Sequence, residues 1–366
     1  MSTVRWKQIA ESIRREIEEG KWRPGDQLPV EAELAEQWGV SRMTAHRAMN
    51  ELQRLGLVVR RQRRGTVVAS KSTRRTGHIS LLLHNSHDRL EMDYLRGIHA
   101  GIASDAKLVV CDTEGDADKE AHYLRRMAVE TDGILLFPTC DPRNNPLIVR
   151  LLEQGVHIVC VDRYLEGVSV DAFVTDNYAC TLESLRFLIR QGIYPIAHFT
   201  QGDLWTSSVR ERYQAYLDAM HEAGASSPEM WCRRFPVLNQ RERASLTQLA
   251  ADALIAVRQR APELRAVFCL NDYHLVAVLE ACDELGWRVP EDLQVLSFHD
   301  CVSLLPQTER RLHRLVQQPF ELGRLAAERM LQYLKGHSLT PAVVRLPATF
   351  YPAQPQNTSS KGGSLP

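Results

Sequence analysis

The fold of the amino-terminal part of the chain is decided by twelve residues, Gly39-Val40-Ser41-Arg42-Met43-Thr44-Ala45-His46-Arg47-Ala48-Met49-Asn50. Gly39 and Val40 predict a tight turn, and serine at position 41 is a preferred helix N-cap. The spacing that follows is helical and places Ala45, Ala48 and Met49 on one face. The opposite face carries Met43, His46, Arg47 and Asn50, with Arg42 at its N-terminal edge. The stretch therefore predicts a helix with one buried side and one polar, basic side.

The flanking sequence completes a small domain. Apolar residues from Trp6 to Ile17 follow helical spacing and predict a first helix, which Gly20 ends. A short helix with Leu34, Ala35 and Trp38 facing inward precedes the turn. Residues 57–61 and 66–68 predict a hairpin with a basic tip. Together these elements predict a winged helix-turn-helix, whose second paired helix enters the major groove of DNA.

The distribution of charge also separates the front of the chain from the rest. Residues 1–75 hold 16 Lys and Arg against 9 Asp and Glu, a net charge of +7, whereas the remainder carries −7. The chain of 366 residues is neutral as a whole, and its length predicts two or three domains. The basic front domain therefore indicates a polyanionic partner.

The front domain resembles the GntR family of bacterial transcription regulators. The resemblance rests on five spaced motifs: Gly25-Asp26-Gln27-Leu28-Pro29, Glu31-x-Glu33-Leu34-Ala35, Gly39-Val40-Ser41-Arg42-x-Thr44, Leu52-x-x-x-Gly56-Leu57 and Gly65-Thr66. It implies binding to double-stranded DNA, with Arg42 as a reader of guanine. The residues expected to contact DNA are Ser41, Arg42, Met43, Thr44, His46, Arg47, Arg63, Arg64 and Gly65.

Four positions of this domain need comment. Met43 either contacts a thymine methyl group or packs on the neighbouring helix, and both possibilities stay open. Val30 and Ala32 depart from the family pattern, which has a small serine at the first position and often a DNA-contacting arginine at the second. Arg63 stands at the wing tip, where glycine is usual. We therefore expect its side chain to insert into the minor groove, in place of the close approach of the backbone that glycine allows.

The rest of the chain alternates short apolar runs with helical patterns, after a linker at residues 70–77. The predicted strands are 79–83, 108–111, 133–137, 157–161, 196–199, 266–270 and 294–298. The predicted helices are 90–104, 118–130, 145–154, 177–191, 208–224, 240–260, 272–285 and 320–336. This alternation predicts an α/β fold with doubly wound parallel sheets, long enough for two lobes. Ligands of such folds bind beyond the carboxyl ends of the strands.

Polar residues follow several predicted strands. They are Asp162-Arg163, the segment from Thr206 to Arg212, Asn271-Asp272 and His299-Asp300. Each alone is explained by the preference of helix caps and turns for Asp and Asn. Four such groups together favour a cleft that binds a hydroxyl-rich or anionic small molecule.

This second part resembles the LacI/GalR effector domain, which shares the bilobal fold of periplasmic binding proteins. The motifs are Val161-Asp162-Arg163, Asp176-Asn177, Arg210-Glu211-Arg212-Tyr213, Asn271-Asp272, Leu285-Gly286-x-x-Val289-Pro290-Glu291-Asp292 and Gln318-Pro319-x-x-x-Leu322-Gly323. The resemblance implies that ligand is held by Asp162, Arg163, Arg212, Asn271, His299 and Gln318. The whole chain is similar to AraR-type arabinose repressors, so a sugar or sugar derivative is the favoured ligand.

Two departures weaken the expectation of a sugar. His299 stands where relatives have an aspartate that grips two hydroxyl groups, and residues 88–91 replace an aromatic platform. The histidine either donates a hydrogen bond to an anion, with a possible pH dependence, or is an ordinary core residue.

The sequence thus predicts four segments: a winged helix at 1–69, a linker at 70–77, an effector domain at 78–352 and a disordered tail at 353–366. We expect a ligand-responsive transcription regulator, favoured as a repressor, that binds a palindromic operator as a homodimer. The alternative is an activator, or a regulator that senses a non-sugar metabolite or a partner protein and whose sugar pocket is non-functional. No catalytic residue, cofactor or metal site is expected, and the chain is not expected to be an enzyme. Residues 1–20 lack an apolar run of signal-peptide length and no run approaches the ~20 residues of a membrane span, which favours a cytoplasmic location.

Overall fold

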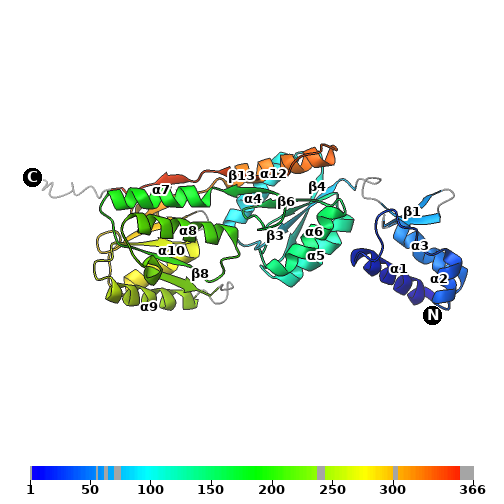
Figure 1. Ribbon diagram of the computed structural model, residues 1–366, viewed down its shortest axis with the longest axis horizontal. Coiled ribbons are helices and arrows are strands. Elements are labelled where there is room, and N and C mark those ends of the chain that lie inside the picture. The colour runs from blue at the N-terminus through cyan, green and yellow to red at the C-terminus, as the bar shows by residue number, and fades with distance from the viewer. Residues whose placement is uncertain are drawn as a thin grey trace, which may run out of the picture.

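The computed structural model describes residues 2–54, 57–61, 65–69, 76–236, 244–299 and 304–354. Three units follow one another along its longest axis: a small head, a first lobe and a second lobe (Figure 1). The head contains α1 (Ser2–Glu18), α2 (Glu31–Gln37), α3 (Arg42–Arg54), β1 (Val58–Arg61) and β2 (Gly65–Val68).

The head has a hydrophobic core of its own. The core is built from α1, α2, α3 and the hairpin, through Ile9, Ile13, Leu34, Ala45, Ala48, Met49, Leu52, Val58 and Val68. Strands β1 and β2 pair antiparallel, with Arg61 opposite Gly65. The predicted winged helix is therefore confirmed, while the wing-tip residues Arg63 and Arg64 lie outside the described residues.

The first lobe is a six-stranded parallel sheet in the order β13-β7-β6-β5-β3-β4. Its strands are β3 (His78–Leu83), β4 (Lys107–Asp112), β5 (Gly133–Leu136), β6 (His157–Val161), β7 (Asp171–Thr175) and β13 (Val343–Leu346). Its helices are α4 (Arg89–Ile102), α5 (Ala117–Glu130), η2 (Pro142–Asn144), α6 (Asn145–Glu153) and α12 (Pro319–Leu334). Two core clusters lie on opposite faces of this sheet, one under α5 and α6 and one under α4 and α12.

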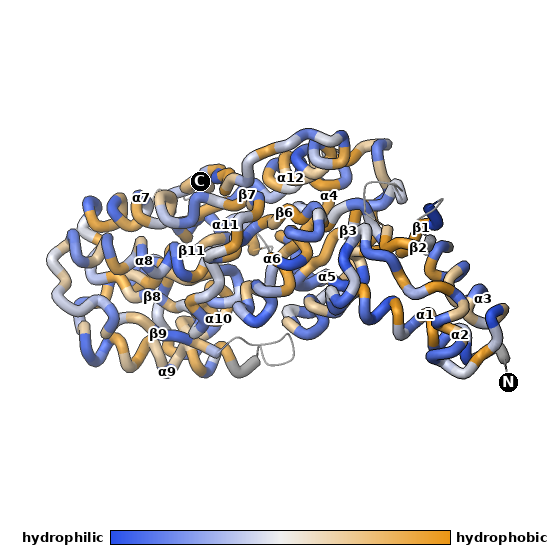
Figure 2. The backbone as a smooth tube through the Cα atoms, turned by 45° about the vertical axis from the view of Figure 1, so that its right-hand side comes forward, coloured by the Kyte–Doolittle hydropathy of each residue, from blue (hydrophilic) through white to orange (hydrophobic). Residues whose placement is uncertain are grey.

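The second lobe is another six-stranded sheet, in the order β14-β12-β11-β10-β8-β9. Its strands are β8 (Ile196–Gln201), β9 (Cys232–Phe235), β10 (Ala266–Cys269), β11 (Gln294–Phe298), β12 (His313–Val316) and β14 (Thr349–Tyr351). Its helices are α7 (Asn177–Arg190), α8 (Ser207–Glu222), η3 (Pro228–Trp231), α9 (Ala244–Arg260), α10 (Asp272–Glu284) and α11 (Pro306–Glu309). Figure 2 shows hydrophobic and hydrophilic stretches alternating along α7 and α9, as expected of helices that cover a sheet with one face.

The chain passes between the lobes three times: from β7 to α7, from β12 to α12 and from β13 to β14. The three crossings are hydrogen-bonded to one another. Asp176 N donates to Leu346 O (2.8 Å), and Thr175 Oγ1 donates to Gln317 Oε1 (2.8 Å). These bonds make the crossings one layer that connects the two sheets.

The seven predicted strands and eight predicted helices of this part correspond to β3, β4, β5, β6, β8, β10 and β11 and to α4–α10 and α12. Strands β7, β9, β12, β13 and β14 were not predicted. Residues 70–75 of the predicted linker and 355–366 of the predicted tail lie outside the described residues. The first tail residues are bonded to the second lobe, because Ala353 N donates to His313 Nδ1 (3.1 Å). In the described ranges, no helix has both the length and the apolar character of a membrane span.

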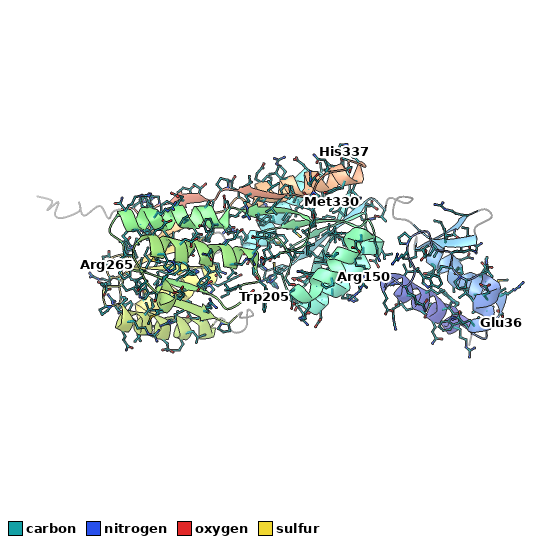
Figure 3. The ribbon with its side chains drawn as sticks, in the orientation of Figure 1. Glu36, Arg150, Trp205, Arg265, Met330 and His337 are labelled. Atoms are coloured by element: carbon teal, nitrogen blue, oxygen red, sulfur yellow. The ribbon has the colours of Figure 1, made fainter. Side chains whose placement is uncertain are left out.

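The head contacts the first lobe through the C-terminal end of α1. Arg150 Nη1 on α6 donates to Glu19 O (3.4 Å), and Val129 of α5 packs against the head core. Arg150 lies on the side of the lobe that is turned toward the head (Figure 3).

Candidate DNA-binding and ligand-binding sites

The amino end of α3 presents the side chains predicted to read DNA. Thr44 N donates to Ser41 Oγ (3.3 Å), so Ser41 acts as the predicted cap. The Ser41 and Thr44 hydroxyl oxygens lie 2.9 Å apart, and Arg42 is exposed beside them. Met43 is 74% exposed, which excludes its packing on the neighbouring helix and leaves contact with a base methyl group as the open possibility.

Other predicted DNA contacts on α3 and the wing are engaged within the head. The Arg47 guanidinium lies 5.2 Å from the centre of the Trp6 ring on α1. His46 Nδ1 donates to Glu31 Oε1 (2.9 Å), which also accepts from Arg60 Nη2 (2.8 Å). Gly65 has a φ of +69°, which favours glycine at this end of the wing.

In the first lobe, Asp162 and Arg163 follow β6 directly. The Arg163 Nε donates to Asp162 Oδ2 (3.2 Å), and Arg163 Nη1 donates to Pro138 O (3.3 Å). The Tyr94 hydroxyl, on α4, donates to the other Asp162 oxygen (3.4 Å). Asp162 has a φ of +67°, a strained conformation for a side-chain-bearing residue, which is often found at functional sites.

Two further titratable residues lie near this pair and were not among the predicted ligand-binding residues. Glu91 Oε2 accepts hydrogen bonds from the backbone N–H groups of His84 (2.8 Å) and Asn85 (2.9 Å). Burial raises the pKa of Glu91 well above its usual range. Burial also lowers the pKa of His84 to about 3, and the nearby Arg163 charge acts in the same direction. The histidine is therefore neutral at physiological pH.

Arg212 of α8 lies at the crossings between the lobes and is 6% exposed. Its Nε donates to Asn177 Oδ1 (2.8 Å), its Nη1 to Leu270 O (2.7 Å) and its Nη2 to Gln317 Oε1 (3.4 Å). The guanidinium also lies 3.4 Å from the centre of the Phe298 ring. Arg212 thus joins two of the three crossings to the carboxyl end of β10.

Asn271 caps α10, as the simpler interpretation of the sequence allowed. Its Oδ1 accepts from Tyr273 N (3.2 Å), His274 N (3.3 Å) and His274 Nδ1 (2.8 Å). The cap uses the side-chain oxygen, while Asn271 itself remains half-buried at the end of β10.

His299, at the carboxyl end of β11, pairs with a carboxylate rather than lying in apolar surroundings. Its Nδ1 donates to Asp272 Oδ1, and its Nε2 lies 3.6 Å from Glu309 Oε1. Burial alone would lower the pKa of His299, but the two carboxylates outweigh it and the pKa is raised. The cationic form is therefore stabilised at this position.

The structure places Gln317, not Gln318, beside Arg212. Gln318 Nε2 donates to Pro347 O (2.7 Å) in the third crossing, whereas Gln317 is buried between Thr175 and Arg212. The sequence motif pointed to Gln318 alone, because the register of the crossing cannot be read from the sequence.

Side chains from the two lobes meet in two places. Ser207 Oγ of α8 accepts from Tyr164 N (3.0 Å), and the Tyr164 hydroxyl donates to Glu211 Oε1 (3.0 Å). Arg345 of β13 pairs with the same Glu211 through two bonds (2.7 and 3.0 Å). Away from these contacts, the Tyr273 hydroxyl of α10 donates to Asp88 Oδ2 (3.0 Å). Asp162 and Arg163 belong to the first lobe, and Arg212, Asn271 and His299 belong to the second.

A separate cavity of about 380 Å³ lies on the second lobe, around Trp287, Arg288, Thr308 and Arg311. None of the six predicted ligand-binding residues lines it.

Comparison with known proteins agrees with this architecture. Residues 6–68 match the model of the gntR family of bacterial regulatory proteins, and residues 185–353 match the periplasmic binding protein-like domain. The chain joins a gntR-family head to a periplasmic binding protein-like domain.

Relatives match this combined chain over most of its length. The "Arabinose metabolism transcriptional repressor" of Geobacillus stearothermophilus is 25% identical over 341 residues, which cover 91% of this chain and 92% of that protein. The "HTH-type transcriptional regulator GntR" of Escherichia coli (strain K12) is 24% identical and covers 88% of this chain and 97% of its own length. Among solved structures, "transcriptional regulator CelR-cellobiose complex" superposes with a TM-score of 0.64 at 20% identity, over 88% of this chain and 98% of that chain. The last comparison supports the fold alone.

Proposed function

We propose that the protein is a transcription regulator in which a small molecule bound between the two lobes changes the affinity of the head for DNA. The observation that carries the proposal is the joining of an α3 helix with exposed Arg42 and Met43 to a pair of lobes connected by three bonded crossings. Repression is the favoured direction of control, since the relatives that match most of the chain include a named repressor.

The lobe contacts suggest how ligand would act. Asp162 and Arg163 belong to one lobe and Arg212 and Asn271 to the other, so a ligand that touches both sets favours one arrangement of the lobes. A ligand can shift the DNA affinity only by its differential affinity for the two arrangements, typically about 1–3 kcal/mol. Because Glu19 and the head core contact α6 and α5, a movement of the first lobe would be passed directly to the head.

The favoured ligand is a sugar or sugar derivative. Carboxylate, guanidinium and amide groups at the strand ends match hydroxyl groups through directed hydrogen bonds. The relative that superposes on 88% of this chain is described as a cellobiose complex, and another is an arabinose-metabolism repressor.

A thermal-shift screen tests the ligand assignment. The full chain is heated with pentoses, hexoses, aldonates, uronates, sugar phosphates and nucleosides, because a ligand that binds only the folded state raises the melting temperature. A binder should stabilise the wild type and fail to stabilise Arg163→Met. If the same compounds stabilise Arg163→Met equally, the ligand does not bind at this site.

Binding of DNA is tested by selecting duplexes from a randomised pool at low salt. We expect a palindromic site, because a homodimer presents two heads related by a twofold axis. Affinity should fall steeply with salt, since the wing and α3 carry several arginines. Sedimentation of the complex measures the number of chains per duplex, and one chain on a single half-site would contradict the dimer.

A further inference from the structure

One acidic side chain lies on the surface that the head presents to DNA. Glu31 is the first residue of α2, and its Oε1 accepts from His46 Nδ1 of α3 (2.9 Å) and from Arg60 Nη2 of β1 (2.8 Å). Arg60 Nη2 also donates to Asn50 Oδ1 of α3 (3.0 Å). A carboxylate beside phosphates weakens DNA binding, so its presence here calls for a reason.

The hydrogen bonds define a single donor arrangement. The two hydrogens of Arg60 Nη2 are directed to Glu31 and Asn50, so the His46 Nδ1 that lies 3.2 Å away carries its own hydrogen and donates it to Glu31. In the neutral imidazole the remaining Nε2 is then an acceptor. The side chains of Glu31, His46 and Arg60 are 35%, 38% and 42% exposed. These three hydrogen-bonded side chains are therefore partly buried in the head and partly accessible to a ligand.

Glu31 itself is held in place. Val30 N donates to Glu33 Oε2 (3.0 Å), which fixes the beginning of α2 one residue before Glu31. A carboxylate in the first turn also interacts favourably with the helix dipole. The position of the carboxylate is thus set by the backbone of α2, and it can orient flexible partners from α3 and the wing.

We propose that Glu31 is a specificity-determining residue of the head, which positions His46 and Arg60 for reading one base pair. The inference rests on the proposed binding of DNA. By fixing the hydrogen on His46 Nδ1, Glu31 leaves Nε2 to accept from an exocyclic amino group, which in the major groove means adenine N6 or cytosine N4. By holding Arg60 against Asn50, it keeps that guanidinium from pairing freely with any phosphate, which lowers binding to unrelated sequence.

The test compares Glu31→Ala, Glu31→Gln and a matched control, Glu36→Ala. Glu36 lies on the same helix, is exposed, and is labelled at the outer end of the head in Figure 3. The wild type first selects its preferred duplex from a randomised pool. Dissociation constants are then measured for that duplex, for its single-base variants and for an unrelated duplex of equal length.

We expect Glu31→Ala to bind the unrelated duplex more tightly and to lose about tenfold or more of its preference at one base pair per half-site, with other positions unchanged. Glu31→Gln should recover part of that preference, because its carbonyl oxygen still accepts from His46. Glu36→Ala removes the same charge and should shift the affinity for all duplexes by a similar factor. A second variant, His46→Phe, should relax the same base pair as Glu31→Ala.

The outcomes separate this inference from the function on which it rests. If the wild type selects no sequence and binds no duplex at low salt, the proposed function fails. If the wild type selects a site and Glu31→Ala, folded by circular dichroism, keeps the same base preference at every position, only the role of Glu31 is refuted. A uniform loss of affinity at all positions would likewise refute it, since that is the effect of a merely structural residue.

Discussion

Replacement of Arg212 by methionine tests whether this residue holds the crossings together as well as facing the ligand. Arg212→Met keeps much of the side-chain volume but removes the donors that serve Asn177 Oδ1 (2.8 Å) and Leu270 O (2.7 Å). A hydrogen bond to a charged group contributes about 1.5–3 kcal/mol, so two of them predict a loss of about 3–6 kcal/mol. The third bond, at 3.4 Å to Gln317, adds little.

The expected loss is large enough to measure by thermal unfolding. At roughly 2–4 °C per kcal/mol for a unit of this size, the melting temperature should fall by at least about 6 °C. Gln214→Met is the matched control on the same helix, because Gln214 is exposed and its Nε2 donates to the exposed face only, to Asp218 Oδ1 (2.9 Å), so its loss should cost about 1 kcal/mol or less. If both variants melt within 2 °C of the wild type at about pH 7, the bonds of Arg212 do not stabilise the crossings and our reasoning is wrong.

Three further predictions concern the head, the first lobe and the pH dependence. Arg42→Ala should weaken binding to the selected duplex by roughly 1–3 kcal/mol and relax one base preference, and unchanged preference in the selection would exclude Arg42 as a reader. Gly97→Ala places a Cβ 1.9 Å from Phe320 O, so α4 and α12 must separate. Denaturant unfolding should show a loss of about 1–3 kcal/mol in the free energy of unfolding. The control Gly202→Ala, whose Cβ would lie 3.6 Å from Phe235 O, should show no loss. Burial lowers the pKa of His198 to about 3, so between about pH 6 and pH 4 the unfolded chain takes up a proton that the native state does not. As pH falls through this range, His198 should therefore reduce the free energy of unfolding by up to about 1.4 kcal/mol per pH unit. In His198→Gln, the dependence of the free energy of unfolding on pH should be weaker by that amount.

The regular elements were predictable where their periodicity is strong. The helices of the core combine long apolar faces with caps such as Asp176 and Asn271, and the buried strands β5 and β6 contain uninterrupted apolar runs. Strand β7 was missed because it begins with Asp171, a residue that is disfavoured in strands. The Asp171 carboxylate accepts from Arg329 and from Ala342 N, partners more than 150 residues away that no local pattern reveals.

The candidate site was predictable in position but only partly in detail. Strand ends located Asp162, Arg163, Arg212, Asn271 and His299, because parallel strands bring their carboxyl ends to one edge. The sequence did not reveal that Glu31 engages His46 and Arg60, since that contact joins three separate elements. Nor did the sequence reveal that Gln317 rather than Gln318 is buried beside Arg212, since this depends on the side-chain directions along the extended segment between β12 and α12.

The triple passage between the lobes has a practical consequence for dissecting the molecule. In chain order, helix α12 and strand β13 of the first lobe come after β12 of the second lobe, and β14 then belongs to the second sheet again. Neither lobe is therefore one continuous piece of polypeptide, and no single cut releases either of them intact. Chimaeras that exchange sensors must transplant residues 76–354 entire, whereas the head can be exchanged at one junction, within residues 70–75.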